Sequence, residues 1–373
     1  MSSEKGKSPM IRIAFLDVGQ GDTSVITCPE TQEAIVVDCI DEQAVIDYLR
    51  REQIRHLRGV IVTHIHADHY KGVAGLLRNC AHALGIEGCE VLASSDDIID
   101  LRSFSAKAAA TKWPPDNDKH STMYDEPRLI RRQSSLANLY HWTKTHRDQC
   151  EPLRDTRRLA LPFDGTLVQS LSLIHPPHVD YSRLRMSGLN NISVVLHVKG
   201  SGSSALLMGD LEYAGWRTLK VNHPDIACDV LKFPHHGGTW QEDETDDLLS
   251  VLAPSVVVLS VGSDNTYGHP SPGVFASLQR RNDVYLLCTQ ATNSCLVEGS
   301  VQNEVPAITE KIRSQVCKEG AFFVIPRPKQ CPCAGTVIVE LADQLRIVQP
   351  DRGFHKNEII HAHFKGHKCL API

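Results

Sequence analysis

The pattern of apolar and polar positions predicts short strands and helices along most of the chain. Short apolar runs bounded by polar turn residues are typical of buried strands. Early in the chain they occur at residues 11–16, 23–27, 34–37 and 59–62. Asp41 stands where a helix N-cap belongs, because the apolar positions after it have helical spacing, and a second helix is expected at about 70–78. Strands followed by strand–helix alternation favour layered α/β packing, with helices that cover sheet faces.

Residues 94–160 break this rhythm and predict an insertion. They are polar, with a loop at 113–118 and expected helices around 128–147. The strand pattern then returns at 167–174, 192–198, 205–208, 230–233, 256–260, 284–288 and 335–341, and helices are expected at 212–220 and 272–279. We therefore expect one domain over residues 1–300 and a C-terminal extension over residues 301–373 that completes a sheet.

The composition is that of an ordinary soluble globular protein. Of 373 residues, 42% are hydrophobic and 22% are charged. The start of the chain is polar and lacks the apolar core of a signal peptide, and no stretch approaches the ~18 apolar residues that a membrane span requires. Twelve cysteines without an export signal favour thiols or metal ligands over disulfides. These features predict a cytoplasmic protein with no membrane partner.

Charge is distributed unevenly along the chain. The formal net charge of −5 argues against a protein that binds nucleic acid through a globally cationic surface. Residues 102–158, however, hold 12 Lys/Arg against 7 Asp/Glu, a local +5, so the remainder carries −10. Aromatic residues lie among these cations at Trp113, Tyr124, Tyr140 and Trp142. This mixture suits the binding of a nucleic-acid strand, and a solvated helical insertion with a few core aromatics explains it equally well.

The most informative motif follows the apolar run 59–62. Directly after that run stand three histidines and a carboxylate, His64, His66, Asp68 and His69. Neutral imidazoles and carboxylates are the ligands that borderline metals such as zinc prefer. A strand end fixes the first of these side chains, and the turn that follows can direct the others toward one point. The motif therefore predicts a metal site rather than a chance cluster of surface histidines.

Three later strand ends also finish in groups that can bind metal. Asp210 follows the run 205–208, the pair His235 and His236 follows the run 230–233, and His269 comes after the strand predicted at 256–260. A centre with two metals needs ligands that converge from several strands, ideally with one carboxylate that bridges both ions. Four such strand ends make that convergence a reasonable expectation.

Taken in order, these segments resemble the metallo-β-lactamase-fold hydrolases, and within them the hydrolase domain of ComEC-type DNA-uptake proteins. The resemblance rests on the segments 16–22, 63–69, 190–196, 207–210, 230–237 and 267–270. It implies an αββα sandwich, here with a helical insertion, and two divalent metal ions, zinc or manganese, at one edge of the sheets.

The resemblance also implies roles for individual residues. His64 and His66 are the expected ligands of the first metal, Asp68 and His69 those of the second, and Asp210 the bridge between them. One imidazole of the pair at 235–236 should complete the second site. Of the two, His235 is preferred over His236, because it lies nearer the strand end.

One departure from the family pattern concerns the first metal. Many members place a third histidine just before the strand predicted at 192–198, where this chain has Asn190 and Asn191. His175, at the end of the preceding strand, is a candidate replacement, although an ordinary loop histidine is at least as good an interpretation. Asp38 is expected to orient a ligand histidine from behind, and Asn191 is placed with it among the residues around the ligands.

A hydrolytic mechanism follows from these assignments. Metal coordination lowers the pKa of a bound water toward neutrality and stabilises the charge that develops on a phosphodiester. Asp68 is then expected to take the proton of the attacking water, and His269 or His236 to donate one to the leaving group. Lys232 is a candidate contact to phosphate, although a lysine at a strand end is more often simply solvated.

Cysteines and histidines form a second constellation toward the C-terminus. It comprises Cys295, Cys317, Cys331, Cys333, His361, His363, His367 and Cys369. Such residues can form a structural zinc site, but buried inert thiols are the favoured interpretation.

The sequence as a whole predicts a soluble metal-dependent hydrolase, specifically a phosphodiesterase or nuclease with DNA or RNA as its substrate. One alternative is a hydrolase of a small ester, lactone or cyclic nucleotide. Another is an interaction subunit of a multi-protein system, which would have no physical need for an intact set of ligands.

Overall fold

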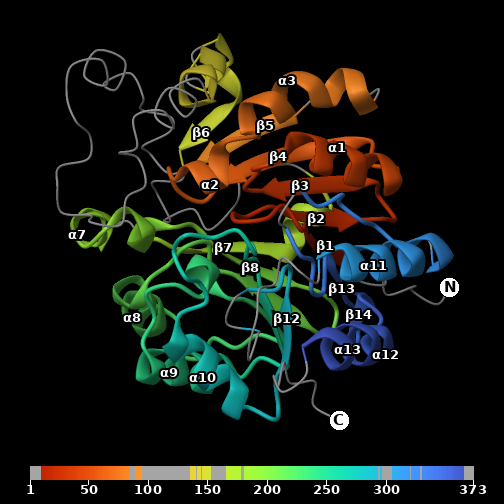
Figure 1. Cartoon of the computed structure of the whole chain (residues 1–373). Coiled ribbons are helices and arrows are strands. Elements are labelled where there is room, and N and C mark those ends of the chain that lie inside the picture. The colour runs from red at the N-terminus through yellow and green to blue at the C-terminus, as the bar shows by residue number, and fades with distance from the viewer. Residues whose placement is uncertain are drawn as a thin grey trace, which may run out of the picture.

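Two β-sheets lie face to face at the centre of the molecule, and helices cover their outer faces (Figure 1). This computed structural model describes residues 10–84, 89–94, 135–139, 141–143, 145–152, 165–177, 180–292, 295, 305–319, 321–327 and 330–364. Most of the predicted insertion, including Trp113, Tyr124 and Tyr140, lies outside the described residues, so its proposed contact with nucleic acid stays a prediction.

The first sheet joins the beginning of the chain to its end. Its strands have the order β14-β13-β1-β2-β3-β4-β5-β6. They are β1 (Ile11–Phe15), β2 (Ser24–Cys28), β3 (Glu33–Val37), β4 (His56–Val62), β5 (Cys89–Ser94), β6 (Cys150–Pro152), β13 (Val337–Leu341) and β14 (Leu345–Gln349). Pairing is antiparallel from β14 to β3 and parallel from β3 to β6. Strands β13 and β14, from the predicted C-terminal extension, therefore belong to this sheet.

The second sheet brings three parallel strand ends to one edge. Its order is β12-β11-β10-β9-β8-β7. The strands are β7 (Leu171–His175), β8 (Val195–Lys199), β9 (Ser204–Leu207), β10 (Val230–Lys232), β11 (Val256–Leu259) and β12 (Tyr285–Cys288). The segment β9 to β12 is parallel, whereas β7, β8 and β9 pair antiparallel, so that β8 and β9 form a hairpin. Since β9, β10 and β11 run in one direction, the residues after their carboxyl ends lie at the same edge.

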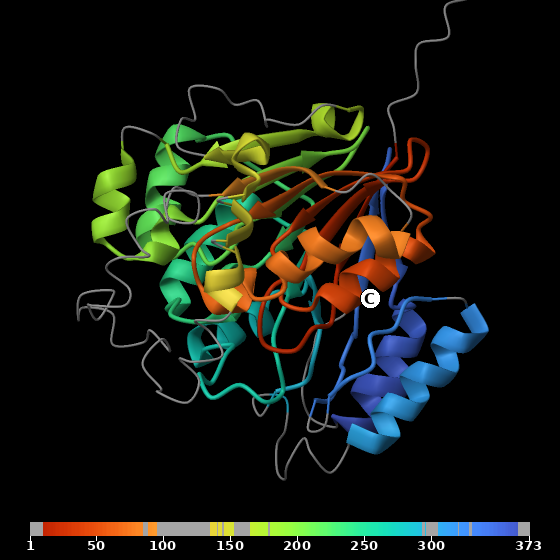
Figure 2. The same ribbon diagram turned by 90° about the horizontal axis from the view of Figure 1, so that it is seen from above.

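Helices flank both sheets. Over the first sheet lie α1 (Glu42–Arg51) and α3 (Val73–Leu84), and over the second lie α8 (Tyr213–Asn222), α9 (Glu242–Leu252) and α10 (Pro272–Arg280) (Figure 1). A group at one end of the molecule contains α11 (Val305–Glu319), α12 (Arg352–Phe354), η10 (His355–Ile360) and α13 (His361–His363) (Figure 2). Shorter elements are α2 (Ala67–Tyr70), α7 (Tyr181–Met186), η3 (Arg147–Gln149), η4 (Leu167–Ser170), η6 (Leu189–Ile192) and η7 (Pro234–Gly237).

Three apolar layers hold this arrangement together. Strand β11 shows the principle, because successive side chains of a strand point to opposite faces. Its Val258 belongs to the layer between the two sheets, and Val257 belongs to the layer beneath α8, α9 and α10, which Trp216 and Leu248 also occupy. A third layer lies between the first sheet and helices α1 and α3. Burial of each such side chain contributes about 1.5–3 kcal/mol, and the layers confirm the predicted αββα sandwich.

Local sequence signals account for several element boundaries. The Asp41 side chain accepts hydrogen bonds from the amides of Gln43 and Ala44, which confirms the predicted N-cap of α1. Helix α9 was not predicted, because its first turns are a run of acids. It is fixed instead by a capping box between Gln241 and Glu244 and by buried leucines on one face.

Other elements differ from the sequence prediction. The strand predicted at 167–174 begins as the 3-10 helix η4, and only its second half forms β7. Strand β6 lies inside the predicted insertion yet pairs with β5, so this part of the insertion extends the sheet. The division of domains at residue 300 stays a prediction. Among the parts of the chain described above, no helix combines the length and apolar character that a membrane crossing needs.

The cysteine constellation is only partly within the described residues. Cys295, Cys331 and Cys333 are buried and none of the three forms a disulfide bond, and Cys333 Sγ lies 3.4 Å from His355 Nε2. Across the described ranges, no group of three cysteine, histidine or acidic side chains in this region brings its ligand atoms close enough to share an ion. His367 and Cys369 lie outside those ranges. Inert thiols are therefore the better description of the three cysteines that the structure places.

Candidate metal centre

Six loops and turns meet where strands of both sheets end. They follow β1, β3, β4, β9, β10 and β11. Asp210 lies at the centre of this region and is buried, with its amide donating to Ser193 Oγ. The preceding Gly209 has φ +53, and a Cβ there would lie 3.1 Å from the Cβ atoms of both Ser193 and Thr63. Glycine is therefore required by backbone conformation and by space at the position that aims Asp210.

His69 is held from behind by Asp38. The Asp38 carboxylate accepts from His69 Nδ1 at 2.7 Å and from the amide and hydroxyl of Thr63, both at 2.8 Å. A carboxylate can only accept, so Nδ1 carries a proton and Nε2 faces Asp210 Oδ1 at 3.1 Å. Burial alone would lower the pKa of His69, but the carboxylates of Asp210 and Asp38 outweigh it and raise the pKa well above its ordinary value. Asp38 thus makes the contact that its predicted orienting role needs.

His236 approaches Asp210 from the other side. Its Nδ1 donates to the Ser260 carbonyl at 2.7 Å, which leaves Nε2 3.7 Å from Asp210 Oδ1 and 3.5 Å from Asp68 Oδ2. The sequence favoured His235 for this place, and the structure corrects that choice. The reason is the turn after β10: Pro234 begins η7, and the next two residues both have left-handed φ. This backbone directs the second ring toward Asp210 Oδ1, on the side of His69, and the first ring toward the other oxygen of Asp210.

His64 and His66 face each other across a short gap. His64 Nε2 lies 2.9 Å from His66 Nδ1 and 3.7 Å from Asp210 Oδ2. His64 is fully buried, and burial together with His69 and His66 holds its pKa well below the ordinary value. It is therefore neutral, which is the state that can bind a metal ion.

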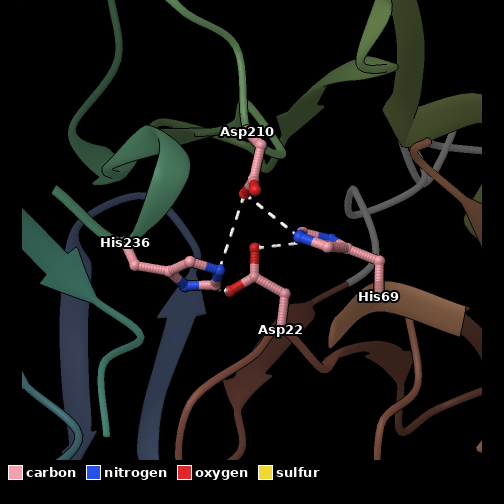
Figure 3. Close-up of side chains that lie close together, drawn as sticks. All are labelled: Asp22, His69, Asp210 and His236. Carbon is pink, nitrogen blue, oxygen red and sulfur yellow. Dashed lines mark ion pairs between the residues drawn. The ribbon is translucent and has the colours of Figure 1, made fainter. Parts of the chain in front are cut away.

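Two groups of side chains bring their ligand atoms within 4.8 Å of one another. The first consists of His64, His66 and Asp210, and the second of Asp22, His69, Asp210 and His236 (Figure 3). Asp210 belongs to both groups. His69 Nε2, His236 Nε2 and Asp210 Oδ1 are buried without a hydrogen-bond partner, a costly state that a bound cation would relieve. Because the other nitrogen of each ring is held by a carboxylate or a carbonyl, these residues fit the pattern of metal-ligating histidines.

Asp22 is a site residue that the sequence interpretation treated only as part of a loop. Its carboxylate lies 3.9 Å from His69 Nδ1 and 3.5 Å from His236 Nδ1, opposite Asp210 (Figure 3). Both of those nitrogens already have partners, so Asp22 supports the two rings from behind. The segment 16–22, which ends β1 with two glycines and this carboxylate, was the signal that could have identified it.

Lys232 is paired with Asp22 inside the protein. Its ammonium group contacts Asp22 Oδ2, and only 2% of the residue is exposed. The expected contact between Lys232 and a substrate phosphate is therefore wrong, and so is the alternative of a solvated lysine. The pair instead offsets one of the carboxylate charges that surround the histidines.

Asp68 lies at the rim of the site. About a third of its side chain is exposed (32%), and Oδ2 lies 3.5 Å from His236 Nε2. Burial would raise the pKa of Asp68, but the nearby imidazole of His236 and the charge of His69 outweigh it and lower the pKa below its ordinary value. Asp68 is thus ionised and can be reached by solvent, while its role as a ligand stays a prediction.

His175 and Asn191 stabilise the loop in front of β8 rather than the site itself. His175 Nε2 lies 2.9 Å from the Asn191 carbonyl, and burial lowers the pKa of this histidine to about 4. The Asn191 side chain binds Glu212 and the amide of Gly215 at the start of α8. Because Nε2 of His175 is taken by the Asn191 carbonyl, the structure does not support the use of His175 as the third histidine of the first metal.

His269 lies beside the ligand groups without belonging to either. Its ring centroid is 5.4 Å from that of His235 and 5.6 Å from that of Tyr267, on which it stacks. The ring occupies the space over Gly238, where a Cβ would overlap it. Burial, followed by the neighbouring His236 and His235, lowers the pKa of His269 to about 4. Tyr267 is 41% exposed and is a further residue at the rim that the sequence interpretation did not single out as a functional candidate.

The two-sheet sandwich and its His/Asp cluster define the class of protein. The chain belongs to the metallo-beta-lactamase superfamily, which matches residues 16–261, more than half of the sequence. Among curated proteins, the chain is 38% identical over 93 residues to ComE operon protein 3 of Bacillus subtilis. That match covers 25% of this chain and only 12% of the relative, so the two proteins share one short region.

Solved structures with a similar fold share little sequence with the chain. The metallo-beta-lactamase fold protein YhfI from Bacillus subtilis is 10% identical, with a TM-score of 0.37 over 72% of this chain and 93% of that one. The short form of human tRNase Z is 13% identical, with a TM-score of 0.36 over 67% of this chain and 92% of that one. The fold and the cluster together describe a metallo-beta-lactamase-fold hydrolase with a site able to hold divalent metal.

Proposed function

We propose that the protein is a metal-dependent phosphodiesterase that cleaves DNA or RNA. The observation that carries the proposal is the convergence of His69 Nε2, His236 Nε2 and Asp210 Oδ1, all buried and without hydrogen-bond partners. His64 and His66 form a second group that shares Asp210. A purely structural domain has no reason to keep such unsatisfied atoms together.

The donor set indicates the chemistry. Two divalent ions, when bound to imidazole and carboxylate, lower the pKa of an attacking water and stabilise the charge that develops on a phosphodiester. Asp210 fixes the spacing of the two groups, because one carboxylate takes part in both. Asp22, Asp38, Asp68 and Asp210 surround the histidines with negative charge, which favours a cation at this place.

Two residues at the rim are the candidates for proton transfer. Asp68 is ionised and partly exposed, so it can hold the attacking water and take its proton. His236 holds the Ser260 carbonyl through Nδ1, and its Nε2 belongs to a candidate ligand group, which leaves His269 as the proton donor for the leaving group. His269 is neutral in the free protein, and a phosphate bound beside it would raise its pKa, since a neighbouring negative charge favours the imidazolium.

Preference for nucleic acid has support from outside the ligand set. The sequence of the basic segment 102–158 combines cations with Trp113, Tyr124 and Tyr140, a composition that suits phosphate attraction and base stacking. Trp142 of the same segment is buried and does not contribute to such a surface. Tyr267 adds an exposed ring next to His269. The sequence motifs also resemble ComEC-type hydrolase domains more than hydrolases of small molecules.

A panel of substrates tests the proposal. Protein reconstituted with zinc or manganese is incubated with labelled single- and double-stranded DNA and RNA, with a cyclic nucleotide and with a chromogenic ester. We expect cleavage of nucleic acid that chelator abolishes, and loss of that cleavage in His64→Ala but not in His56→Ala, a matched change at an exposed histidine. Preferred hydrolysis of the ester or the cyclic nucleotide would replace the nuclease proposal with the small-molecule alternative.

A further inference from the structure

The adjacent residues His235 and His236 contact different oxygens of the same carboxylate. Their ring centroids are 6.4 Å apart, with 62° between the ring planes. His236 Nε2 faces Asp210 Oδ1 at 3.7 Å, on the side of His69. His235 Nε2 faces Asp210 Oδ2 at 3.9 Å, and the same oxygen lies 3.7 Å from His64 Nε2. The two histidines of one turn therefore belong to opposite sides of Asp210.

The backbone of this turn is built to separate the two rings. His235 and His236 have φ of +51 and +53, a left-handed conformation that costs roughly 1–2 kcal/mol for each residue with a side chain. The turn is tied to the Asp210 loop by a hydrogen bond from the His235 amide to the Gly209 carbonyl at 3.1 Å. Such strain at two consecutive residues persists where a specific side-chain placement is needed.

The far nitrogen of His235 is already supported. Nδ1 lies 3.2 Å from Thr239 Oγ1 and 3.6 Å from Glu212 Oε1. Glu212 also accepts from the Asn190 side-chain amide at 3.1 Å, and that amide lies 3.5 Å from the His235 ring nitrogens. The Glu212 carboxylate favours the tautomer with the proton on Nδ1, in which Nε2 keeps the lone pair that can bind a metal ion. Asn190 stands in the segment where the family resemblance leads us to expect a histidine, and its side-chain amide lies beside the His235 ring.

We propose that His235 is the third histidine of the first metal site, where it replaces the histidine absent from positions 189–191, and that Glu212 orients it. The inference rests on the proposed function, because it assumes that Asp210 joins two ions. In this chain the pair after β10 thus supplies one ligand to each ion. His175, the candidate that the sequence offered, is instead part of the loop in front of β8.

Metal stoichiometry tests this assignment without reference to activity. The full chain is stripped with chelator, titrated with Zn²⁺ against a competing indicator, and titrated separately with Co²⁺ for its visible spectrum. Glycine is the preferred replacement at both histidines, since it adopts positive φ without strain. Thermal unfolding in chelator verifies that each variant is folded.

We expect two ions per chain in the wild type and in His175→Ala, and only one tightly bound ion in His235→Gly and in His236→Gly. The two glycine variants should lose different components of the Co²⁺ spectrum. Added imidazole should restore the second ion to His235→Gly. Two ions with wild-type affinity in His235→Gly would overturn the assignment, as would loss of an ion in His175→Ala. A wild-type chain that binds no ion would instead overturn the proposed function itself.

Discussion

Asp38 accepts a hydrogen bond from His69 Nδ1 at 2.7 Å, and this contact decides which nitrogen of His69 faces Asp210. Both residues are buried, so water cannot replace either partner without disturbing the loops around them. The contact depends on the left-handed φ of Asp38 (+57), which turns its side chain toward the site immediately after β3.

Replacement of Asp38 by Asn should weaken metal binding at the site of His69. Asn tolerates the left-handed conformation, but it removes the negative charge that holds the ring. Loss of such a supporting group typically lowers metal affinity about 10–100-fold, and competition with a zinc indicator measures it. Asp283→Asn, at an exposed surface carboxylate, is the control. Equal affinity in Asp38→Asn and Asp283→Asn would show that the contact does not support a ligand.

Gly209→Ala should destabilise the protein and displace Asp210. The new Cβ would press on Thr63 and Ser193, and the alanine would have to adopt a positive φ that is unfavourable for any residue with a side chain. Gly335→Ala is a matched control, because Gly335 also has positive φ (+67) but nothing within 4 Å. In both variants the strain of a side chain at positive φ should lower the free energy of unfolding by roughly 1–2 kcal/mol. Gly209→Ala should lower it further, because its Cβ also meets Thr63 and Ser193. Urea unfolding in chelator measures both changes. Equal losses would mean that the loop adapts to the added methyl group.

Lys232→Met should lower stability strongly, because it leaves Asp22 charged and unpaired inside the protein. Removal of one partner of a buried pair costs about 3–5 kcal/mol. The double variant Lys232→Met/Asp22→Asn should recover part of this loss, since neither member of the pair then carries a charge. A change in KM without any change in unfolding free energy would instead support the contact to substrate that the structure contradicts.

Asp17 should make stability fall as pH rises toward neutrality. Its carboxyl is buried, with one bond from Gln290 and one oxygen without a partner, and burial raises its pKa to about 7. Between its unfolded pKa near 4 and pH 7, the folded state binds a proton that the unfolded state has released. Stability is therefore lost as pH rises through this window and levels off above it.

Asp17→Asn should remove that dependence. Relative to the variant, the wild type is expected to lose about 2–3 kcal/mol between pH 5 and pH 8, measured by urea unfolding in chelator. Parallel curves for the two proteins would show that Asp17 is ionised in the fold throughout this range.

Tyr267→Ala should weaken the binding of single-stranded nucleic acid, whereas Tyr267→Phe should retain it. The exposed ring beside His269 can stack on a base, a contact worth roughly 1–3 kcal/mol, which corresponds to about a 5- to 150-fold change in Kd. Fluorescence anisotropy with a labelled oligonucleotide measures it. Unchanged affinity in Tyr267→Ala would exclude the ring from the binding surface.

Much of the fold was predictable from the sequence because periodicity and local caps determine it. The N-cap at Asp41 and the hairpin of β8 and β9 are signals contained in a few neighbouring residues. Helix α9 was missed because a run of acids resembles a solvated loop until its leucines meet α10 and the second sheet. Strand β6 was missed because its three residues pair with a strand more than fifty positions away.

The site, like the fold, has features that local sequence determines and features that depend on distant residues or on backbone conformation. The gathering of His64, His66 and His69 around Asp210 could be predicted, since strand ends and spacing specify it, and the roles of these residues as metal ligands stay a prediction. The choice between His235 and His236 could not, because it depends on the φ angles of two consecutive residues. The partner of Lys232 was equally hidden: Asp22 lies 210 positions away and meets it only when the two sheets pack together.

The central claim is that Asp210 joins two metal sites that cleave nucleic acid. It is tested most directly by measuring metal content and cleavage together on the wild type, on Asp210→Asn and on the control Asp283→Asn. A labelled oligonucleotide serves as substrate, with and without chelator. The account predicts that the wild type and the control each bind two ions and cleave the oligonucleotide in a reaction that chelator abolishes. In Asp210→Asn, neither ion should bind tightly, and cleavage should fall at least ~10³-fold. Cleavage that persists in Asp210→Asn, or in the presence of chelator, would contradict it.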